Sequence, residues 1–141
     1  MTKIHKPQHY GDDSDHWVDV EESPRRVHVV FGGETIADSR HVLLVREAMR
    51  VPVYYFPKED VRADLMVATG HSTHCPYKGN ASYWTVKVGG KIFKDFVWTY
   101  PDPIPECPKI KDLLCFFNER VDAIYVDGEL LAALKTRWSL G

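Results

Sequence analysis

Apolar and polar residues alternate over several short stretches of this chain, with the period of two that is typical of β-strands buried on one face. In residues 27–38 the alternation is interrupted by Gly32-Gly33, and in residues 82–100 by Gly89-Gly90. Each glycine pair supplies the positive φ angles that a two-residue hairpin turn requires. The pattern therefore predicts two antiparallel hairpins.

Shorter patterns predict the remaining elements. Residues 51–56 form a β-rich run that ends at Pro57, because proline offers no amide hydrogen to a strand ladder. The apolar residues of 41–47 fit a strand or a helix, since periodicity does not separate the two over so short a run. We also expect a helical turn or a strand at 60–65, a helical turn at 106–112, a third hairpin from 113–117 and 121–126, and an amphipathic helix over 129–138.

Together these elements describe a mainly β protein, a compact antiparallel β-domain of six or more strands with short helical turns and a C-terminal helix. We expect a single β-domain over residues 25–129 and a helical extension over 130–141. Residues 1–24 are polar, with clustered acidic residues, and such a composition disfavours independent burial. We therefore expect a flexible or loosely packed leader, in which Trp17 and Val18 are able to dock onto the body.

Composition and charge narrow the possible functions. A chain of 141 residues that is 44% hydrophobic fits one globular domain. The formal net charge of −2 disfavours binding to nucleic acid or to an anionic membrane surface, because both need a basic excess. The apolar runs are too short to span a bilayer, and we expect no secretory signal. Three irregularly spaced cysteines do not suggest a disulfide framework, so we expect a reducing, cytoplasmic location.

Residues 71–84 hold a dense group of chemically versatile side chains, which we expect on a loop that leads into a strand. The candidate catalytic residues in it are His71, His74, Cys75 and Lys78. A thiol becomes a nucleophile when its surroundings favour the thiolate, which makes Cys75 the candidate nucleophile. The alternatives are an unreactive thiol and a lysine that anchors an anionic ligand group or stays in solvent.

The same segment offers possible zinc ligands, but closed zinc sites normally pair two Cys-x-x-Cys units or matched cysteine and histidine pairs. Cys107 and Cys115 belong to no such pair. Lys78-Gly79 lacks the preceding glycine of a phosphate loop, and no helix is expected after Gly32-Gly33, as a dinucleotide-binding motif would require. We therefore expect no metal and no cofactor.

The turn at Gly89-Gly90 sorts the side chains of the second hairpin onto two faces, unless a bulge exchanges them. One face is apolar, as expected for a core: Trp84, Val86, Val88, Phe93 and Val97. The other is polar near the turn and aromatic at its far end: Tyr83, Thr85, Lys87, Lys94, Phe96, Trp98 and Tyr100. An aromatic surface beside a polar segment suits a small molecule or a cation; alternatively, these rings fill the core. The expected ligand-binding residues are Tyr55, His71, His74, Cys75, Lys78, Tyr83, Trp98 and Tyr100.

Several blocks, in this order, resemble the bacterial family called domain of unknown function 427, and together they cover roughly residues 25–129. The blocks are 25–39, 54–61, 71–79, 81–84, 98–103 and 126–129. The resemblance implies a compact antiparallel β-domain similar to the β-tent group of folds, which includes zinc-bound members and ligand binders with aromatic cages. This sequence lacks the paired Cys-x-x-Cys ligands of the zinc-bound members. The family sometimes carries a nucleotidyltransferase label, for which the sequence shows neither a phosphate loop nor a metal-binding carboxylate pair.

Three hypotheses for the function follow. The first is a small soluble β-domain that binds a small molecule in an aromatic-lined pocket beside residues 71–80. The second is an enzyme that uses Cys75 as nucleophile, or Lys78 as base or anion anchor. The third is a protein-interaction module that uses exposed strands or the acidic leader. The sequence predicts neither the identity of the ligand nor the oligomeric state.

Overall fold

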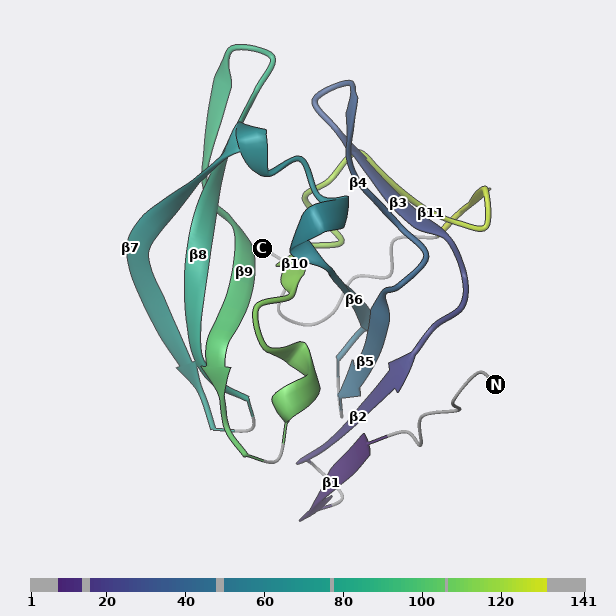
Figure 1. Cartoon of the computed structure of the whole chain (residues 1–141), viewed down its shortest axis with the longest axis vertical. Helices are drawn as coiled ribbons and strands as arrows, with labels where there is room; N and C mark the ends of the chain where they lie inside the picture. Colours follow the sequence, from purple (N-terminus) through teal and green to yellow (C-terminus); the bar gives the residue numbers. More distant parts are fainter. Residues whose placement is uncertain (1–7, 14–15, 48–49, 77, 106, 132–141) are drawn as a thin grey trace.

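A computed structural model of the chain describes residues 8–13, 16–47, 50–76, 78–105 and 107–131. Its regular structure is mainly antiparallel β-sheet (Figure 1). The strands are β1 (Gln8–Asp13), β2 (His16–Glu22), β3 (Val27–Phe31), β4 (Glu34–Ser39), β5 (Leu43–Glu47), β6 (Val53–Phe56), β7 (Met66–Cys75), β8 (Gly79–Val88), β9 (Lys91–Pro103), β10 (Leu114–Phe116), β11 (Ala123–Val126) and β12 (Glu129–Leu130). An eight-stranded sheet has the order β1-β2-β5-β6-β10-β9-β8-β7, and a four-stranded sheet has the order β12-β11-β3-β4. The prediction of a mainly β, antiparallel fold is confirmed.

Both glycine-centred hairpins form as predicted. Phe31 pairs with Glu34 across Gly32-Gly33, and all four glycines of the two turns have positive φ angles between 60° and 80°. Across the second turn, Val88 pairs with Lys91 and Val86 with Phe93, which is the register that a two-residue turn dictates.

The expected third hairpin is wrong, although both of its strands exist. Strand β10 lies between β6 and β9 in the large sheet, whereas β11 pairs with β3 and β12 in the small sheet. All three residues of β10 are buried, as expected for a central strand covered on both faces. Residues 117–122 therefore connect two sheets and do not close a hairpin.

Helical structure is limited to three short 3₁₀ turns, which are η1 (Lys58–Asp60), η2 (Ala63–Leu65) and η3 (Pro108–Ile110). They confirm the helical turns expected near 60–65 and 106–112. The helix expected over 129–138 is wrong where the structure describes it. Asp127 and Gly128 have positive φ and reverse the chain, so that Glu129 pairs with Val126 as the start of β12; residues 132–141 lie outside the described residues.

No helix in the described ranges has the length and apolar character needed to cross a bilayer.

The described part of the leader belongs to the large sheet, contrary to the expectation of a loosely packed arm. Strand β2 pairs with β5 over five residues, and Val18 and Val20 are fully buried. The reason is a short alternation in which these valines point inward between acidic residues such as Asp19 and Glu21. The composition of the segment is dominated by acidic residues, so an expectation based on composition misses the alternation of the two valines.

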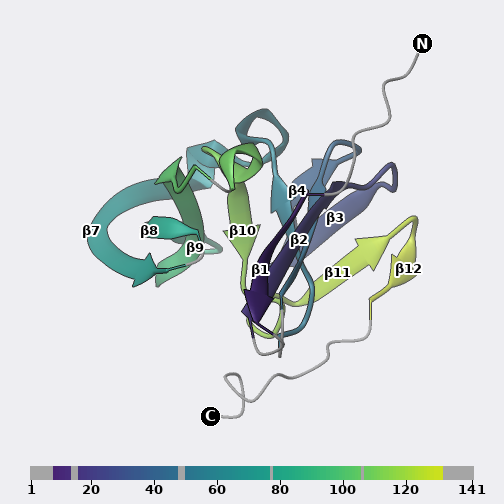
Figure 2. The same cartoon turned by 90° about the horizontal axis from the view of Figure 1, so that it is seen from below.

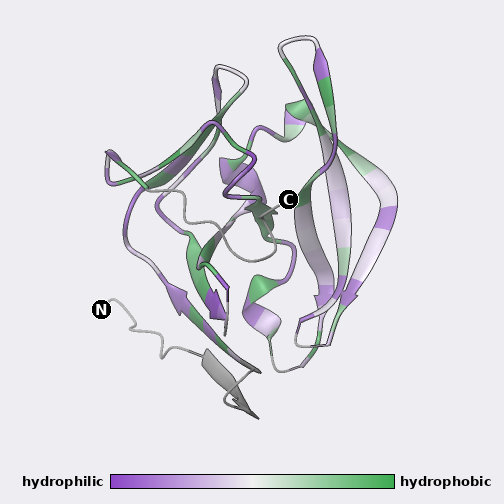
Figure 3. Ribbon diagram, turned by 180° about the vertical axis from the view of Figure 1, so that it is seen from behind, coloured by the Kyte–Doolittle hydropathy of each residue, from purple (hydrophilic) through white to green (hydrophobic). Residues whose placement is uncertain are grey.

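Two hydrophobic clusters form on opposite faces of the large sheet, because neighbouring residues of a strand point to opposite sides. On one face Phe56, Leu114 and Val97 pack with buried residues of the small sheet such as Val29. On the other face lies the second cluster, which includes Tyr55, Cys115 and Trp98. The alternation of hydrophobic and hydrophilic residues is visible along the strands in Figure 3.

The large sheet is strongly bent at its β7–β9 end, which curls around as seen in Figure 2. The register of β7 with β8 shifts between Ala68 and Ser72, and that of β8 with β9 shifts between Trp84 and Val86. Opposite the second shift, Asp95 in β9 has a φ of 51°. Such irregularities increase the local twist of a sheet.

The bend also changes one expected face of the second hairpin. Phe96 was expected beside Trp98 and Tyr100, but it packs in the other cluster, with its ring centroid 4.4 Å from that of Phe31. The extra residues of β9 around Asp95 interrupt the regular alternation of side chains. The side chain of Phe96 therefore does not share the face of Trp98 and Tyr100. The five residues of the expected apolar face do pack in the first cluster.

The burial of β2 predicts a large difference between two identical substitutions. Val20→Ala removes two buried methyl groups and is expected to lower the free energy of unfolding by about 2 kcal/mol. Val67→Ala on the edge strand β7, where the side chain is 49% exposed, is expected to change it by less than about 0.5 kcal/mol. Urea unfolding measures both, and equally small losses would mean that residues 16–22 do not dock.

Candidate functional site

A row of side chains crosses the second-cluster face of the large sheet. Tyr55 of β6 pairs with Cys115 of β10, Cys115 pairs with Trp98 of β9, and Trp98 pairs with Tyr83 of β8. Paired residues of neighbouring strands point to the same side, so the register brings three aromatic rings and a thiol together from distant parts of the sequence.

Polar contacts fix the orientation of these rings. The indole Nε1 of Trp98 donates a hydrogen bond of 3.1 Å to the hydroxyl of Tyr55. The hydroxyl of Tyr83 lies 2.9 Å from Oγ1 of Thr73, within hydrogen-bonding distance. Phe117 covers Trp98, with 4.6 Å between their ring centroids, and the guanidinium carbon of Arg120 lies 4.2 Å from the centroid of Phe117. The rings therefore form an ordered wall.

A buried ion pair lies beside this wall. The Nζ of Lys78 donates a hydrogen bond to Oε1 of Glu47, and both side chains are buried. Nε of Arg50 lies 3.8 Å from the second carboxylate oxygen of Glu47, and the side chain of Arg50 is 46% exposed. One buried carboxylate therefore faces two cations, one buried and one open to solvent.

The turn between β7 and β8 holds Lys78 in this position. The amide of Lys78 donates to the carbonyl of Cys75, and its carbonyl accepts from the amide of Ile104. The next residue, Gly79, has a φ of 119°, and a side chain there would lie 3.3 Å from the backbone of Asp102 and Ile104. The turn therefore requires glycine, and it anchors the lysine backbone to the end of β9.

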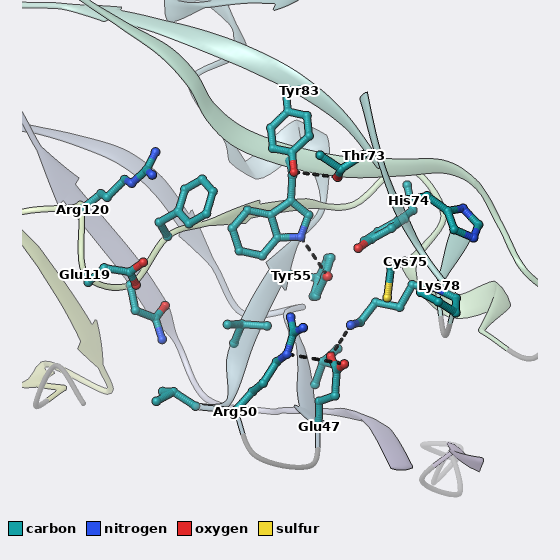
Figure 4. A pocket seen from close by; sticks show the side chains of 18 residues that line it. Glu47, Arg50, Tyr55, Thr73, His74, Cys75, Lys78, Tyr83, Glu119 and Arg120 are labelled. Atoms are coloured by element: carbon teal, nitrogen blue, oxygen red, sulfur yellow. Dashed lines mark hydrogen bonds and ion pairs between the residues drawn. The ribbon is translucent and has the colours of Figure 1, made fainter. Parts of the chain in front are cut away.

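The aromatic wall and the ion pair line one cavity of about 610 Å³, shown in Figure 4. Its lining includes Glu47, Arg50, Thr73, Phe117, Glu119 and Arg120. It also includes, of the predicted ligand-binding residues, Tyr55, His74, Cys75, Lys78, Tyr83, Trp98 and Tyr100. Of the predicted set, only His71 is not part of this lining.

The two histidines do not pair with Cys75. The ring of His71 packs on Tyr83, with a centroid distance of 4.7 Å, and Nδ1 of His74 lies 2.7 Å from Oδ1 of Asn80. His74 follows Thr73 in a strand, so its side chain points to the opposite face, and Figure 4 shows its ring directed away from Lys78. Residues 71–75 belong to β7 and not to a loop. The strand alternation separates the ring of His74 from the thiol, whereas the ring of His71 is held on Tyr83.

Burial dominates the acid–base properties of the cavity wall. Loss of hydration raises the pKa of the Tyr55 hydroxyl well above its usual value, and the nearby Cys115 adds to the effect. Burial also raises the pKa of Tyr100, with a further contribution from Cys75. The pKa of the Cys115 thiol is raised by burial despite the opposing charge of Lys78. These groups therefore keep their protons at neutral pH.

Within the described part of the chain, no group of three or more His, Cys, Asp or Glu side chains is placed to hold a metal ion. Cys75 and Cys115 are free thiols, and the side chains of Cys107 and Cys115 are fully buried.

The sequence reasoning missed Glu47, Arg50, Phe117 and Arg120. Glu47 follows Leu43 and Val45 at an inward position of its strand, so a carboxylate at the end of an apolar alternation was an available signal. The other three residues lie outside the strands. Nothing in their local sequence pattern relates them to residues 71–84.

A comparison with protein families finds that residues 19–127 match the model of a family described as Domain of unknown function (DUF427). The match covers most of the chain and includes the described strands from β2 to β11 except the first residues of β2. Among curated proteins, none matches this chain.

The buried ion pair predicts strong coupling between two substitutions. Lys78→Met leaves the carboxylate of Glu47 without its buried partner and is expected to cost about 3 kcal/mol of unfolding free energy. The double variant with Glu47→Leu and Lys78→Met is expected to recover most of this loss, because no buried charge is left unpaired. Urea unfolding of both single variants and the double variant gives the coupling energy.

Lys87→Met provides the control, because Lys87 is exposed on β8 and the substitution is the same. We expect its effect to stay within about 0.5 kcal/mol. Additive losses in the double variant would contradict a direct interaction between Glu47 and Lys78.

The raised pKa values predict loss of stability at alkaline pH. As the pH rises, the unfolded chain releases the protons of Tyr55, Tyr100 and Cys115 before the folded chain does. Below about pH 8 these groups contribute fully to the free energy of unfolding, and above about pH 9 their contribution declines. Each group that is ionised only in the unfolded chain lowers the free energy of unfolding by about 1.4 kcal/mol per pH unit. Tyr100→Phe is expected to make the decline above about pH 10 shallower by nearly one such slope. Urea unfolding between about pH 7 and 11 tests this, and equal slopes in both proteins would be inconsistent with it.

Proposed function

This chain belongs to the DUF427 family, and from the geometry of its cavity we propose that it binds a small molecule with a flat, largely apolar body. The observation that carries the proposal is that the aromatic row and the buried Lys78–Glu47 pair line the same cavity. Ligand sites are typically cavities of this kind, mostly apolar and aromatic, with a few fixed polar groups that orient the ligand.

The size of the cavity and its fixed rings support this function. A volume of about 610 Å³ lies within the usual range of roughly 300–1,000 Å³ for small-molecule sites. The hydrogen bond between Trp98 and Tyr55 and the contact between Trp98 and Phe117 fix the wall through contacts within the protein. A wall ordered in this way loses little side-chain entropy when a flat molecule stacks on it.

Binding is favoured over nucleophilic catalysis by the surroundings of Cys75. One common route to an activated cysteine is a histidine base within hydrogen-bonding reach that is itself oriented by a third group. His74 is engaged with Asn80, and His71 packs on Tyr83. The described residues thus supply Cys75 with no imidazole partner, and the proposed role of Cys75 is to form part of the cavity wall.

Blocking the cavity tests the proposal. Thr73 is an exposed residue of β7 that lines the cavity, so Thr73→Trp is expected to project a ring into it at little cost in stability. Ligand-observed NMR with a set of flat heteroaromatic fragments should identify binders of the native protein. Their affinity is expected to fall at least about tenfold in Thr73→Trp.

Ser72→Trp is the matched control, because Ser72 is also exposed and the strand alternation points its side chain to the opposite face. Its fragment affinities are expected to match those of the native protein within about twofold. The proposal fails if no fragment binds, or if both variants affect binding equally.

A further inference from the structure

We infer that the ligand of this cavity is an aromatic carbonyl compound, of the class of flat ketones, lactones and lactams, whose carbonyl oxygen accepts a hydrogen bond from the hydroxyl of Tyr100. The inference rests on the proposed function and adds the chemical class and the orientation of the ligand. It follows from a buried hydroxyl that lines the cavity and has no hydrogen-bond partner among the described residues.

The hydroxyl of Tyr100 lies at the cavity. Tyr100 follows Trp98 by two residues on β9, its side chain is only 6% exposed, and both residues line the cavity. Burial raises the pKa of this hydroxyl, and Cys75, Glu47 and Tyr83, which also line the cavity, raise it further. Because electrostatic effects weaken with distance, the hydroxyl lies close to these three residues.

The polar groups around Tyr100 have other partners. The carboxylate of Glu47 accepts from Lys78, and the hydroxyl of Tyr83 lies within hydrogen-bonding distance of Thr73. Over the part of the chain that the structure describes, no hydrogen bond joins Glu47 or Tyr83 to Tyr100. The proton of the Tyr100 hydroxyl therefore has no acceptor within these ranges.

A ligand that covers this hydroxyl has to supply the acceptor. The proton stays on the oxygen at neutral pH, because burial raises the pKa of Tyr100. When a ligand displaces water without replacing its hydrogen bond, the buried donor is left unpaired, which is costly. A ligand with only N–H groups would meet the oxygen of the hydroxyl but leave its proton unpaired. A carbonyl oxygen, whose lone pairs lie in the plane of a flat ring, is the better complement.

A second tyrosine adds to this preference. The hydroxyl oxygen of Tyr55 accepts from Nε1 of Trp98, as the dashed line in Figure 4 shows. This bond uses the single donor of the indole and leaves the proton of Tyr55 to be donated. Burial raises the pKa of Tyr55 as well, so this proton is also retained at neutral pH. The wall thus presents hydroxyl protons beside the rings on which a flat ligand would stack.

Three flat bicyclic compounds of similar size test the inference. 1-Indanone offers a carbonyl acceptor, indole offers an N–H donor, and indene offers neither. Ligand-observed NMR titrations of the full chain give the dissociation constant of each compound. The ratio of the indene constant to the 1-indanone constant then measures the contribution of the carbonyl oxygen.

Tyr100→Phe removes the hydroxyl and keeps the ring. It is expected to lower the indene-to-indanone ratio about fivefold, which is the effect of one hydrogen bond between neutral groups. The affinity for indene is expected to stay within about twofold, which shows that the cavity is intact. The affinities for indole and indene should change by the same factor.

Two further tyrosines supply matched comparisons. Tyr83→Phe is the same substitution within the cavity, but this hydroxyl already has Thr73 as a partner. It is expected to change the affinities for 1-indanone and indene by the same factor. Tyr54 packs against the first cluster and does not line the cavity, so Tyr54→Phe should leave all three affinities unchanged.

A spectroscopic measurement on the native protein does not depend on the folding of a variant. The carbonyl stretching frequency of bound 1-indanone, measured by infrared difference spectroscopy, is expected to lie below its value in an apolar solvent, because a hydrogen bond weakens the carbonyl bond. In Tyr100→Phe the frequency should return toward the value in apolar solvent.

The outcomes separate the inference from the proposed function. The inference is overturned if 1-indanone does not bind, if its bound carbonyl has the frequency seen in apolar solvent, or if Tyr83→Phe lowers the indene-to-indanone ratio as much as Tyr100→Phe does. In each of these cases the proposed function stands as long as fragments bind in a way that Thr73→Trp abolishes and Ser72→Trp does not. If no fragment binds at all, the proposed function itself fails and the inference fails with it.

Discussion

The buried ion pair between Glu47 and Lys78 joins two strands that the order of the large sheet keeps far apart. Glu47 ends β5, Lys78 lies in the turn between β7 and β8, and β6, β10 and β9 lie between them. A flat sheet would separate these strands by several times the interstrand spacing of about 4.8 Å. The pair therefore exists only because the sheet curls, and burial of both charges requires that the curl close over them.

The curl has a local origin in the irregular pairing of three strands. Extra residues in β7 near Gly70 and in β9 near Asp95 shift the register and add twist. The same irregularities bring the turn of Lys78 across the face that carries Tyr55 and Trp98. A buried ion pair contributes little more to stability than apolar side chains of similar size. The pair lines the cavity, and its place there matters for the ligand binding that we propose.

Only the part of the candidate site that lies on the second hairpin could be predicted from the sequence. Tyr83, Trp98 and Tyr100 could be placed near one another because a hairpin register follows from its glycine turn, and the structure brings them to one cavity. Arg50, Phe117 and Arg120 could not be found, because they lie in connections between strands. Such connections have no periodicity that a sequence pattern could reveal. The pairing of Cys75 with His74 was misleading for a related reason, since successive residues of a strand point to opposite faces.

The sequence alone determined the mainly β character, the two glycine hairpins and the family to which the chain belongs. These depend on local backbone preferences and on the alternation of side chains, which short stretches contain in full. Tertiary structure alone decided that β10 and β11 separate into different sheets, that β2 docks on β5, and that Glu47 meets Lys78. Those outcomes depend on which buried surfaces fit together over long sequence separations, and no local pattern encodes that fit.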